Sequence, residues 1–211
     1  MQKGRFITVE GGEGAGKSSN LAFIQRLLEK AGKQVVFTRE PGGTVLGEEI
    51  RSLLLGHKHE GMAEDTELLL MFAARAEHIQ QIIRPALDVG KWVLCDRFTD
   101  ASYAYQGAGR GISEMRIGVL EQFVQGDLRP DLTLLLDLPV EVGLARAGNR
   151  SAPDRFESEA HDFFRKVREG YLRIAEGATE RVKVIDASPA IEQVQRQIDS
   201  TLKDYLESIN A

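Results

Sequence analysis

Short apolar runs alternate with longer amphipathic stretches along the chain. Five of the apolar runs are rich in valine, isoleucine, leucine and phenylalanine, and they have the length of buried strands. They occupy residues 5–10, 34–39, 91–95, 132–138 and 181–186. Strands that alternate with helices along a chain form parallel sheets with helices on both faces. The pattern therefore predicts an α/β fold with a five-stranded parallel sheet flanked by helices.

The amphipathic stretches between these runs predict the helices. They cover residues 17–31, 45–55, 65–88, 113–125, 140–146, 160–175 and 190–209. Gly32 and Gly56 end the first two helices, and Pro85 is expected to kink or restart the third. Residues 147–157 contain glycine, serine, proline and two arginines, which predicts a mobile flap. Since no repeat or long linker interrupts the pattern, residues 1–211 are expected to form one domain.

Charged residues gather where the predicted strands end. Glu10, Asp96 and Asp186 end or directly follow three of the runs, and Arg39 ends the second run. In parallel sheets with helices on both faces, ligands bind beyond the carboxyl ends of the strands. We therefore expect these charged side chains at a binding site rather than in the core.

The segment that follows the first strand, residues 11–18, reads GGEGAGKS and matches the phosphate-binding Walker A motif. In this motif, backbone N–H groups surround phosphate oxygens, the lysine reaches the β and γ phosphates, and the serine hydroxyl binds Mg²⁺. A glycine-rich turn that only starts a helix is the alternative, which the position between strand and helix disfavours. The expected nucleotide-binding residues are Gly11, Gly12, Glu13, Gly14, Ala15, Gly16, Lys17, Ser18 and Ser19.

Asp96 ends the apolar segment WVLCD, as the Walker B carboxylate does in phosphate-binding-loop proteins. Mg²⁺ is a hard cation that prefers oxygen ligands, so Ser18 and Asp96 are the expected metal ligands. A strand-end aspartate also caps loops, which is the alternative reading of Asp96. Asp137, at the end of another run, is a weaker candidate for the same role.

Composition and charge narrow the class of protein. With 211 residues, of which 42% are hydrophobic and 28% charged, the chain can bury a core without disulfide bonds. Cys95 is the only cysteine and the start MQKGRF does not resemble a signal peptide, so we expect a cytoplasmic protein. No apolar run is long enough for a membrane span. The net charge of −5 argues against non-specific nucleic-acid binding, whereas arginines in the predicted cleft loops suit a small anionic ligand.

Phosphate-binding loops occur in GTPases, motor ATPases and kinases, and other motifs distinguish these classes. The sequence lacks the Asn-Lys-x-Asp tetrapeptide of GTPases, and we find no oligomeric ATPase motif. Instead it has TREPGGT at residues 38–44, DRF at 96–98 and AYQG at 104–107. Together with the phosphate-binding loop, these motifs resemble the thymidylate kinase family over essentially the whole chain.

This resemblance implies the P-loop NTP hydrolase fold of nucleoside-monophosphate kinases, with a lid at about residues 147–157. It implies transfer of the γ-phosphoryl group of ATP to dTMP with Mg²⁺, forming dTDP, by a homodimer. Since a phosphate monoester with a second pKa near 6 is mostly dianionic at neutral pH, no general base is expected. His57, His59, His78 and His161 therefore receive no catalytic role, and His57 and His59 are expected at the surface.

The resemblance also assigns residues to the acceptor phosphate and the sugar. Arg97 and Arg51 would bind the acceptor phosphate, because a guanidinium group pairs two phosphate oxygens at once. Arg51 as a solvated helix residue is the alternative. Glu13 would approach the 3′-hydroxyl group of the sugar, and Tyr105 would crowd the 2′ position and favour deoxyribose. The other expected acceptor-site residues are Arg39, Glu40, Pro41, Ser102 and Gln106.

Base recognition is expected from the long third helix. Arg75 matches the family's arginine that forms a hydrogen bond with thymine. Family members usually have a stacking phenylalanine four residues earlier, where this sequence has Met71, with Phe72 one position later. Either Met71 or Phe72 packs on the base, and both also fit the core of an amphipathic helix.

Arginines in the predicted flap are candidates for holding ATP. The family divides into members with a catalytic arginine in the phosphate-binding loop and members with it in the lid. This loop has no arginine, so the resemblance implies the bacterial lid-arginine type, with Arg150 and Arg155 as catalytic candidates and Arg146 beside ATP. Solvated flap charges are the alternative for each of the three.

Two other functions compete with a thymidylate kinase. A deoxynucleoside kinase would share the DRF motif, but the paired arginines Arg51 and Arg97 have no use with an acceptor that lacks phosphate. A regulatory nucleotide switch without useful turnover belongs to a different class. The intact Lys17, Asp96 and lid arginines argue against it.

Overall fold

The computed structural model describes residues 4–59, 61–148, 155–156 and 159–209. Five strands form an all-parallel sheet in the order β2-β3-β1-β4-β5. Their bounds are β1 Phe6–Gly11, β2 Val35–Arg39, β3 Trp92–Asp96, β4 Leu132–Asp137 and β5 Val182–Asp186. Each end lies within one residue of its predicted position, so the predicted α/β fold with a five-stranded parallel sheet is confirmed.

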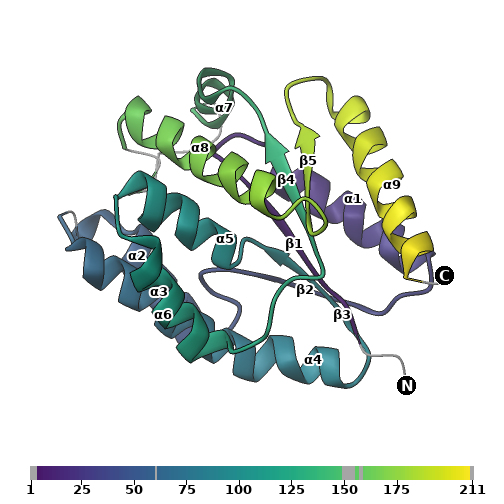
Figure 1. The fold of residues 1–211 in the computed structure, drawn as a ribbon, viewed down its shortest axis with the longest axis horizontal. Coiled ribbons are helices and arrows are strands. Elements are labelled where there is room, and N and C mark those ends of the chain that lie inside the picture. Colours follow the sequence, from purple (N-terminus) through teal and green to yellow (C-terminus); the bar gives the residue numbers. More distant parts are fainter. Residues whose placement is uncertain (1–3, 60, 149–154, 157–158, 210–211) are drawn as a thin grey trace.

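Helices connect the strands and cover both faces of the sheet (Figure 1). The α-helices are α1 Lys17–Lys30, α2 Val45–Leu55, α3 Glu64–His78, α4 Arg84–Asp88, α5 Thr99–Ser102, α6 Glu114–Gln125, α7 Val140–Ala147, α8 His161–Gly177 and α9 Ile191–Ser208. A 3₁₀ helix covers His57–His59, and π-helical segments cover Ile79–Ile83 and Tyr103–Gly109. Across the described ranges, no helix has the length and apolar character that crossing a membrane requires.

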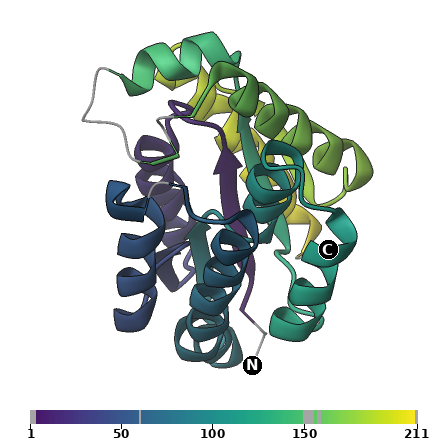
Figure 2. The same cartoon turned by 90° about the vertical axis from the view of Figure 1, so that its left-hand side faces the viewer.

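Alternate residues of the central strand face opposite helix layers. Ile7 and Val9 pack with Ile24 of α1 and Ile198 of α9 on one face of the sheet. Phe6 points to the other face, where it packs with the π-helical segment Ile79–Ile83 and α4. This alternation is the period-two pattern of a strand, and here both faces are buried because helices cover both. The turned view in Figure 2 shows β1 enclosed between the two helix layers.

The long third helix is restarted at its proline, as predicted. The α-helix α3 ends at His78, a π-helical turn follows over Ile79–Ile83, and α4 begins with Pro85 in its first turn. Proline has no N–H group, so it is tolerated in a first turn, where that group needs no partner within the helix.

Residues 99–109 are helical, although no helix was predicted there. The segment YAYQGAG forms π-helical turns after the short α5. Glycine and tyrosine are weak helix formers, so packing must select this conformation. Gly170 and Gly109 let α8 pack closely against this segment. A Cβ at Gly170 would lie 2.8 Å from Ala108, and a Cβ at Gly109 would lie 2.6 Å from Phe163.

Candidate active site

The phosphate-binding loop connects β1 to α1 at the carboxyl edge of the sheet. Gly14 and Gly16 have φ angles of 69° and 80°, a left-handed conformation that glycine adopts without steric cost. No side chain of the described residues caps the amino end of α1, so its N–H groups are left for an anion. Lys17 Nζ donates to the carbonyl groups of Gly11 and Gly12 at 3.1 Å each. Burial, and then the positive charge of Arg97, lower the pKa of Lys17.

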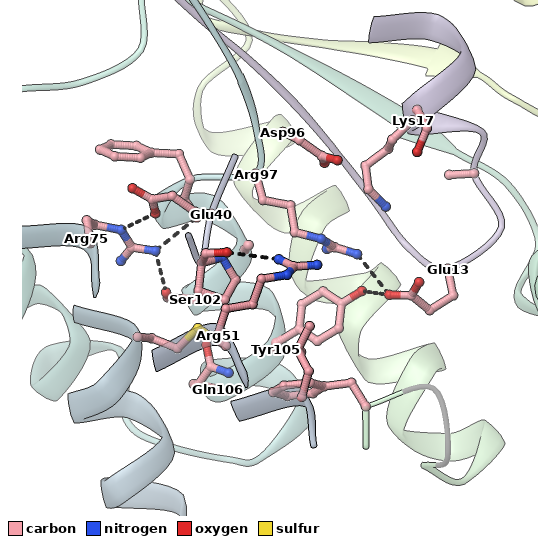
Figure 3. Close-up of a pocket in the computed structure, with 18 of the residues that line it drawn as sticks. Glu13, Lys17, Glu40, Arg51, Arg75, Asp96, Arg97, Ser102, Tyr105 and Gln106 are labelled. Carbon is pink, nitrogen blue, oxygen red and sulfur yellow. Dashed lines mark hydrogen bonds and ion pairs between the residues drawn. The ribbon is translucent and has the colours of Figure 1, made fainter. Parts of the chain in front are cut away.

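A pocket of about 260 Å³ opens beside this loop (Figure 3). Most of the residues predicted for nucleotide, acceptor and metal binding line it. They are Glu13, Gly14, Ala15, Gly16, Lys17, Ser18, Glu40, Pro41, Arg51, Met71, Arg75, Asp96, Arg97, Ser102, Tyr105 and Gln106. Four residues outside the prediction, Leu55, Phe98, Ala101 and Phe156, complete the lining.

Glu13, Arg97 and Tyr105 meet in the middle of the pocket. Glu13 Oε1 accepts hydrogen bonds from Arg97 Nη2 at 2.9 Å and from the Tyr105 hydroxyl at 2.7 Å (Figure 3). The Arg97 guanidinium also lies 4.7 Å from the centre of the Tyr105 ring. The acidic residue in the phosphate-binding loop is thus neutralised by the arginine of the DRF motif, which explains how a carboxylate is tolerated there.

The DRF turn is held by the buried carboxyl group of Glu10. Arg97 has a φ of 67°, which is uncommon for a residue other than glycine. The N–H group of Phe98 donates to Glu10 Oε1 at 2.7 Å, and the Tyr171 hydroxyl donates to Glu10 Oε2 at 2.7 Å. Burial, followed by the charge of Asp100, raises the pKa of Glu10 to about 8.

Glu10 was expected at a binding site, but it and Tyr171 lie behind the pocket lining, where both contact the DRF motif. The position of Glu10 at a strand end was the available signal. Tyr171 also accepts from Arg97 Nη1 at 3.1 Å, but nothing in the pattern of α8 distinguishes it from an ordinary core residue.

Arg75 lies at the end of the pocket opposite Lys17. Its Nε donates to Glu40 Oε2 at 2.7 Å and its Nη2 to Ser102 Oγ at 3.0 Å. Its Nη1 is buried and has no hydrogen-bond partner among the residues that the structure describes. Arg75 Nη1 is therefore available to donate a hydrogen bond to a ligand. A buried donor that has no partner lowers the stability of the folded protein unless a ligand accepts from it.

The two candidates for stacking on the base lie in different surroundings. Met71 lines the pocket. Phe72 is 2% exposed and packs with Leu68, Ile112 and Ile117, outside the pocket lining. Its ring centre lies 4.5 Å from the Arg75 guanidinium, so Phe72 contacts the pocket through Arg75.

Arg51 and Arg39 differ in position. Arg51 lines the pocket and donates from Nη1 to the carbonyl of Pro41 at 2.9 Å. Burial, and then the charge of Arg39, lower the pKa of Arg51. Arg39 forms an exposed ion pair with Glu48 at 2.7 Å and is not part of the pocket lining.

The three predicted flap arginines have separate environments. Arg146 donates to the carbonyl groups of Ala187 and Ser188 at 2.8 and 2.7 Å. Its helix, α7, packs on the phosphate-binding loop, where Gly14 and Gly143 are in close backbone contact. Arg155 is 8% exposed and donates to Glu67 Oε2 and to the carbonyl of Leu54 at 2.7 Å each. Arg150 lies outside the described residues.

The two candidate aspartates are also distinguished. Both carboxylate oxygens of Asp137 accept from Arg168, at 2.8 and 2.9 Å. Asp96 lines the pocket, and its buried Oδ1 has no hydrogen-bond partner in the described part of the chain. Its oxygen, together with the Ser18 hydroxyl in the same pocket, offers the hard donors that Mg²⁺ prefers.

The predicted surface position of two histidines is confirmed. His57 and His59 are exposed on the 3₁₀ helix. His78, in contrast, is fully buried beside Glu40.

A parallel sheet in this order, a phosphate-binding loop after its central strand and an arginine-rich pocket beyond its carboxyl edge define a P-loop nucleotide kinase. A family model described as Thymidylate kinase matches residues 9–198. The chain belongs to the thymidylate kinase family, which confirms the family prediction made from the motifs.

Individual relatives are similar over nearly the whole chain. A thymidylate kinase of Pseudomonas putida is 62% identical over 204 residues, which are 97% of this chain and 97% of that protein. One of Ectopseudomonas mendocina is 60% identical over 205 residues, 97% of this chain and 98% of that protein. The crystal structure of thymidylate kinase from Ehrlichia chaffeensis superposes with a TM-score of 0.77 at 36% identity and covers 96% of this chain and 99% of that one.

Proposed function

We propose that this chain transfers the γ-phosphoryl group of ATP to dTMP, forming dTDP and ADP. The relatives named thymidylate kinase support this reaction. The observation that carries the proposal is that one pocket is lined by the phosphate-binding loop with Lys17 at one end and by Arg75 at the other (Figure 3). The end with the phosphate-binding loop suits the phosphate of a nucleoside monophosphate that faces ATP, and the end with Arg75 suits its base.

The acceptor phosphate would lie between Arg97 and Arg51, close to Lys17. These cations neutralise the charge that spreads over the transferred group and the acceptor oxygens. Because the acceptor phosphate is mostly dianionic at neutral pH, it attacks without a general base. Ser18 and Asp96 would hold Mg²⁺, which supplies further charge neutralisation when bound.

The sugar and base would occupy the rest of the pocket. Glu13 would accept from the 3′-hydroxyl group, and the Tyr105 ring, fixed by its hydroxyl on Glu13, would leave little space at the 2′ position. Arg75 Nη1 would donate to a carbonyl oxygen of thymine, with Met71 against the base. The lining residues Gln106 and Ser102 flank this part of the pocket.

The lid arginines would act at the ATP end. Arg146 extends from the helix that packs on the phosphate-binding loop, which supports a place beside the nucleotide. Arg150 is proposed as the lid arginine at the transferred phosphate, because Arg155 is paired with Glu67 in this structure.

The test is ADP release from ATP and Mg²⁺ with dTMP, dUMP, dCMP, dGMP and thymidine as acceptors. We expect a strong preference for dTMP and little ATP hydrolysis without an acceptor. Activity with thymidine but not with dTMP would assign a nucleoside kinase instead. No ADP release with any of these acceptors would favour a regulatory nucleotide switch.

We also propose that two copies of this chain pair through α6. Met115, Val119 and Phe123 recur every fourth residue on this helix and are 79%, 64% and 86% exposed. Leu69 on the adjoining α3 is 56% exposed. A two-fold axis through the surface formed by these four side chains would bury the same apolar residues of both copies, which is the usual geometry of a homodimer.

Light scattering after size-exclusion chromatography tests the pairing. The wild type is expected at twice the mass of the chain, and Phe123→Asp at the monomer mass. Val89→Asp, at another exposed apolar position (61% exposed), is the control that should remain dimeric. A monomeric wild type would refute the pairing.

A further inference from the structure

His78 is a fully buried histidine one helical turn after Arg75 on α3. Both of its ring nitrogens have a partner. Nδ1 lies 2.9 Å from Glu40 Oε1, and Nε2 lies 2.6 Å from the Thr38 hydroxyl. A buried imidazole with both nitrogens engaged has a fixed position and a fixed ring orientation.

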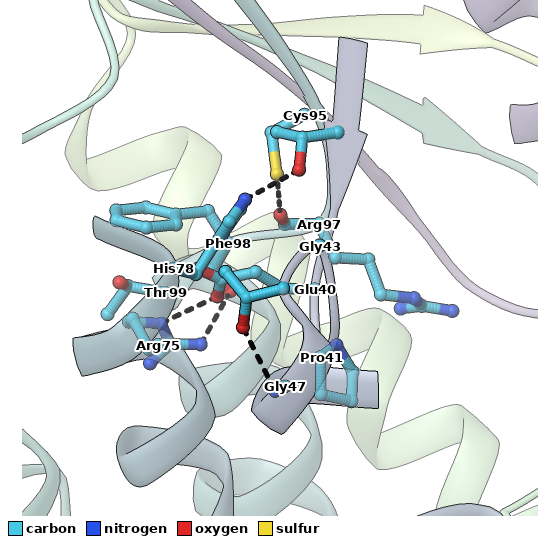
Figure 4. Close-up of polar contacts among 12 residues, drawn as sticks. Glu40, Pro41, Gly43, Gly47, Arg75, His78, Cys95, Arg97, Phe98 and Thr99 are labelled. Carbon is cyan, nitrogen blue, oxygen red and sulfur yellow. Dashed lines mark hydrogen bonds and ion pairs between the residues drawn. The ribbon is translucent and has the colours of Figure 1, made fainter. Parts of the chain in front are cut away.

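Glu40 divides its two oxygens between His78 and Arg75. Oε2 accepts from Arg75 Nε at 2.7 Å, and Oε1 faces His78 Nδ1 (Figure 4). A carboxylate only accepts hydrogen bonds, so Nδ1 carries the proton and donates to Glu40. Since the side chains of Glu40 and Arg75 are 4% and 3% exposed, water does not replace either contact.

The TREPGGT segment encloses the other side of the imidazole. On this side, His78 Nε2 lies 2.6 Å from the Thr38 hydroxyl, which can donate or accept a hydrogen bond. Gly43 has a φ of 81°, and a Cβ there would lie 2.8 Å from His78 Nε2 and 2.6 Å from Thr38 Oγ1. The second glycine of the motif therefore leaves the space that the imidazole fills.

We propose that His78 is a positioning residue for base selection, which acts through Glu40 on Arg75. A continuous chain of contacts runs from Thr38 through His78 and Glu40 to the Arg75 guanidinium. It fixes the guanidinium of Arg75, which lines the pocket and whose Nη1 has no partner in the described residues. This inference rests on the proposed function, in which Nη1 donates to a thymine carbonyl oxygen, and it takes that oxygen to be the one at position 4.

The chemistry of the base supplies a specific readout. Thymine and uracil carry a carbonyl oxygen at position 4, where cytosine carries an amino group. An N–H donor that faces position 4 forms a hydrogen bond with thymine or uracil. It disfavours cytosine, because the N–H donor and the amino group of cytosine would face each other. Displacement of the Arg75 guanidinium therefore lowers the ratio of kcat/KM for dTMP to that for dCMP, whereas KM for ATP stays unchanged.

Two substitutions at position 78 separate the contacts of the ring. In His78→Asn, the side-chain amide nitrogen takes the place of Nδ1 and keeps the donor to Glu40. In His78→Gln, the amide reaches the place of Nε2 and loses that donor. We expect His78→Gln to raise KM for dTMP and to lower the dTMP to dCMP ratio, each by about ten-fold, as for the loss of a hydrogen bond to a charged group. His78→Asn should retain a ratio near that of the wild type.

Two further variants serve as controls for the substitutions at position 78. His59→Gln, at an exposed histidine, should behave as the wild type. If the His78 variants do not fold, Thr38→Val removes only the hydroxyl beside Nε2 and should shift the same ratio by about three-fold. A wild-type ratio in His78→Gln, or equal effects of the Gln and Asn variants, would overturn the proposal.

Arg75→Met distinguishes failure of this inference from failure of the proposed function. If Arg75→Met keeps the dTMP to dCMP ratio, Arg75 does not read the base, and the roles of both Arg75 and His78 fall, whereas phosphorylation of dTMP itself is tested by the acceptor assay. If it loses the ratio and His78→Gln does not, the role of Arg75 stands and only the role of His78 is refuted.

Discussion

Arg155 donates to the Glu67 carboxylate across 2.7 Å, and the two side chains are 8% and 1% exposed. Glu67 also accepts from Gln106 Nε2 at 2.9 Å and contacts Arg110 at 3.3 Å. One buried carboxylate of α3 therefore gathers two arginines and a pocket-lining glutamine, from segments far apart in the chain. This cluster joins the residue pair 155–156 to the wall of the pocket.

Removing the charge of Glu67 is expected to destabilise the protein. Glu67→Gln leaves Arg155 without its counter-charge at a nearly buried site, whereas Arg110 keeps its ion pair with Glu159. Breaking a buried ion pair on one side typically costs about 3–5 kcal/mol. Urea unfolding followed by circular dichroism measures the free energy of unfolding.

An exposed ion pair provides the matched control for this substitution. Asp162 and Arg165 pair on the surface of α8, with side chains that are 60% and 62% exposed. Asp162→Asn should change the free energy of unfolding by less than about 1 kcal/mol, as is usual for surface pairs. Equal effects of Glu67→Gln and Asp162→Asn would contradict the buried role of Glu67.

The fold was predictable from the sequence because its signals are local. Each strand is a short apolar run bounded by turn residues, and the phosphate-binding loop lies in eight consecutive residues between a strand and a helix. The prediction missed the helical segment at 99–109, since its glycines and tyrosines are helical only through packing against α8.

Contacts between distant residues were beyond the sequence patterns. Nothing in the sequence around His78 marks it as a buried contact, because its neighbours Thr38 and Glu40 are about forty residues earlier. The pairing of Arg155 with Glu67 spans 88 positions, and that of Tyr171 with Glu10 spans 161. Arginine, glutamate and tyrosine on amphipathic helices look alike in sequence whether they face solvent, a partner or a ligand.

Lys17→Met is expected to abolish most of the activity. The change removes the one charge of the phosphate-binding loop that the motif directs at the β and γ phosphates, while the stem of the side chain remains. Loss of one preorganised charge at a reacting group lowers kcat by about 10²-fold or more. Coupled ADP release with saturating ATP and dTMP measures it, with Lys30→Met, at the exposed end of α1, as the control. A kcat within two-fold of the wild type for Lys17→Met would refute the assignment of the loop.

Gly14→Ala should lower both stability and nucleotide binding. Gly14 has a φ of 69°, and an added Cβ would collide with the backbone of Gly143 on α7. Gly32→Ala is a matched control, because Gly32 has a φ of 77° but nothing within 4 Å of an added Cβ. The control should lose only the left-handed strain, about 1–2 kcal/mol of unfolding free energy. Gly14→Ala should lose more and should also weaken ATP binding, measured by calorimetry. Equal losses in the two variants would show that the contact with α7 is unimportant.

The buried Glu10 predicts a fall in stability with rising pH. Burial and the neighbouring Asp100 raise its pKa from 4.5 to about 8 in the folded protein. Between these two values, the folded state holds a proton that the unfolded state has released. The contribution of Glu10 to stability is therefore fully present below pH 4.5 and is lost as the pH rises through about 8. Within this window, the free energy of unfolding should fall by as much as about 1.4 kcal/mol per pH unit from this group alone.

Urea unfolding of the wild type and Glu10→Gln at several values between pH 5 and about 8.5 isolates this contribution, since all other groups titrate in both proteins. The glutamine keeps the size of the side chain and does not titrate, so the difference between the two free energies should change steadily across the window. If the two curves stay parallel over the whole range, the carboxyl group is ionised in the folded protein throughout. In that case its hydrogen bonds from Phe98 and Tyr171, with the charge of Arg97, outweigh the effect of burial.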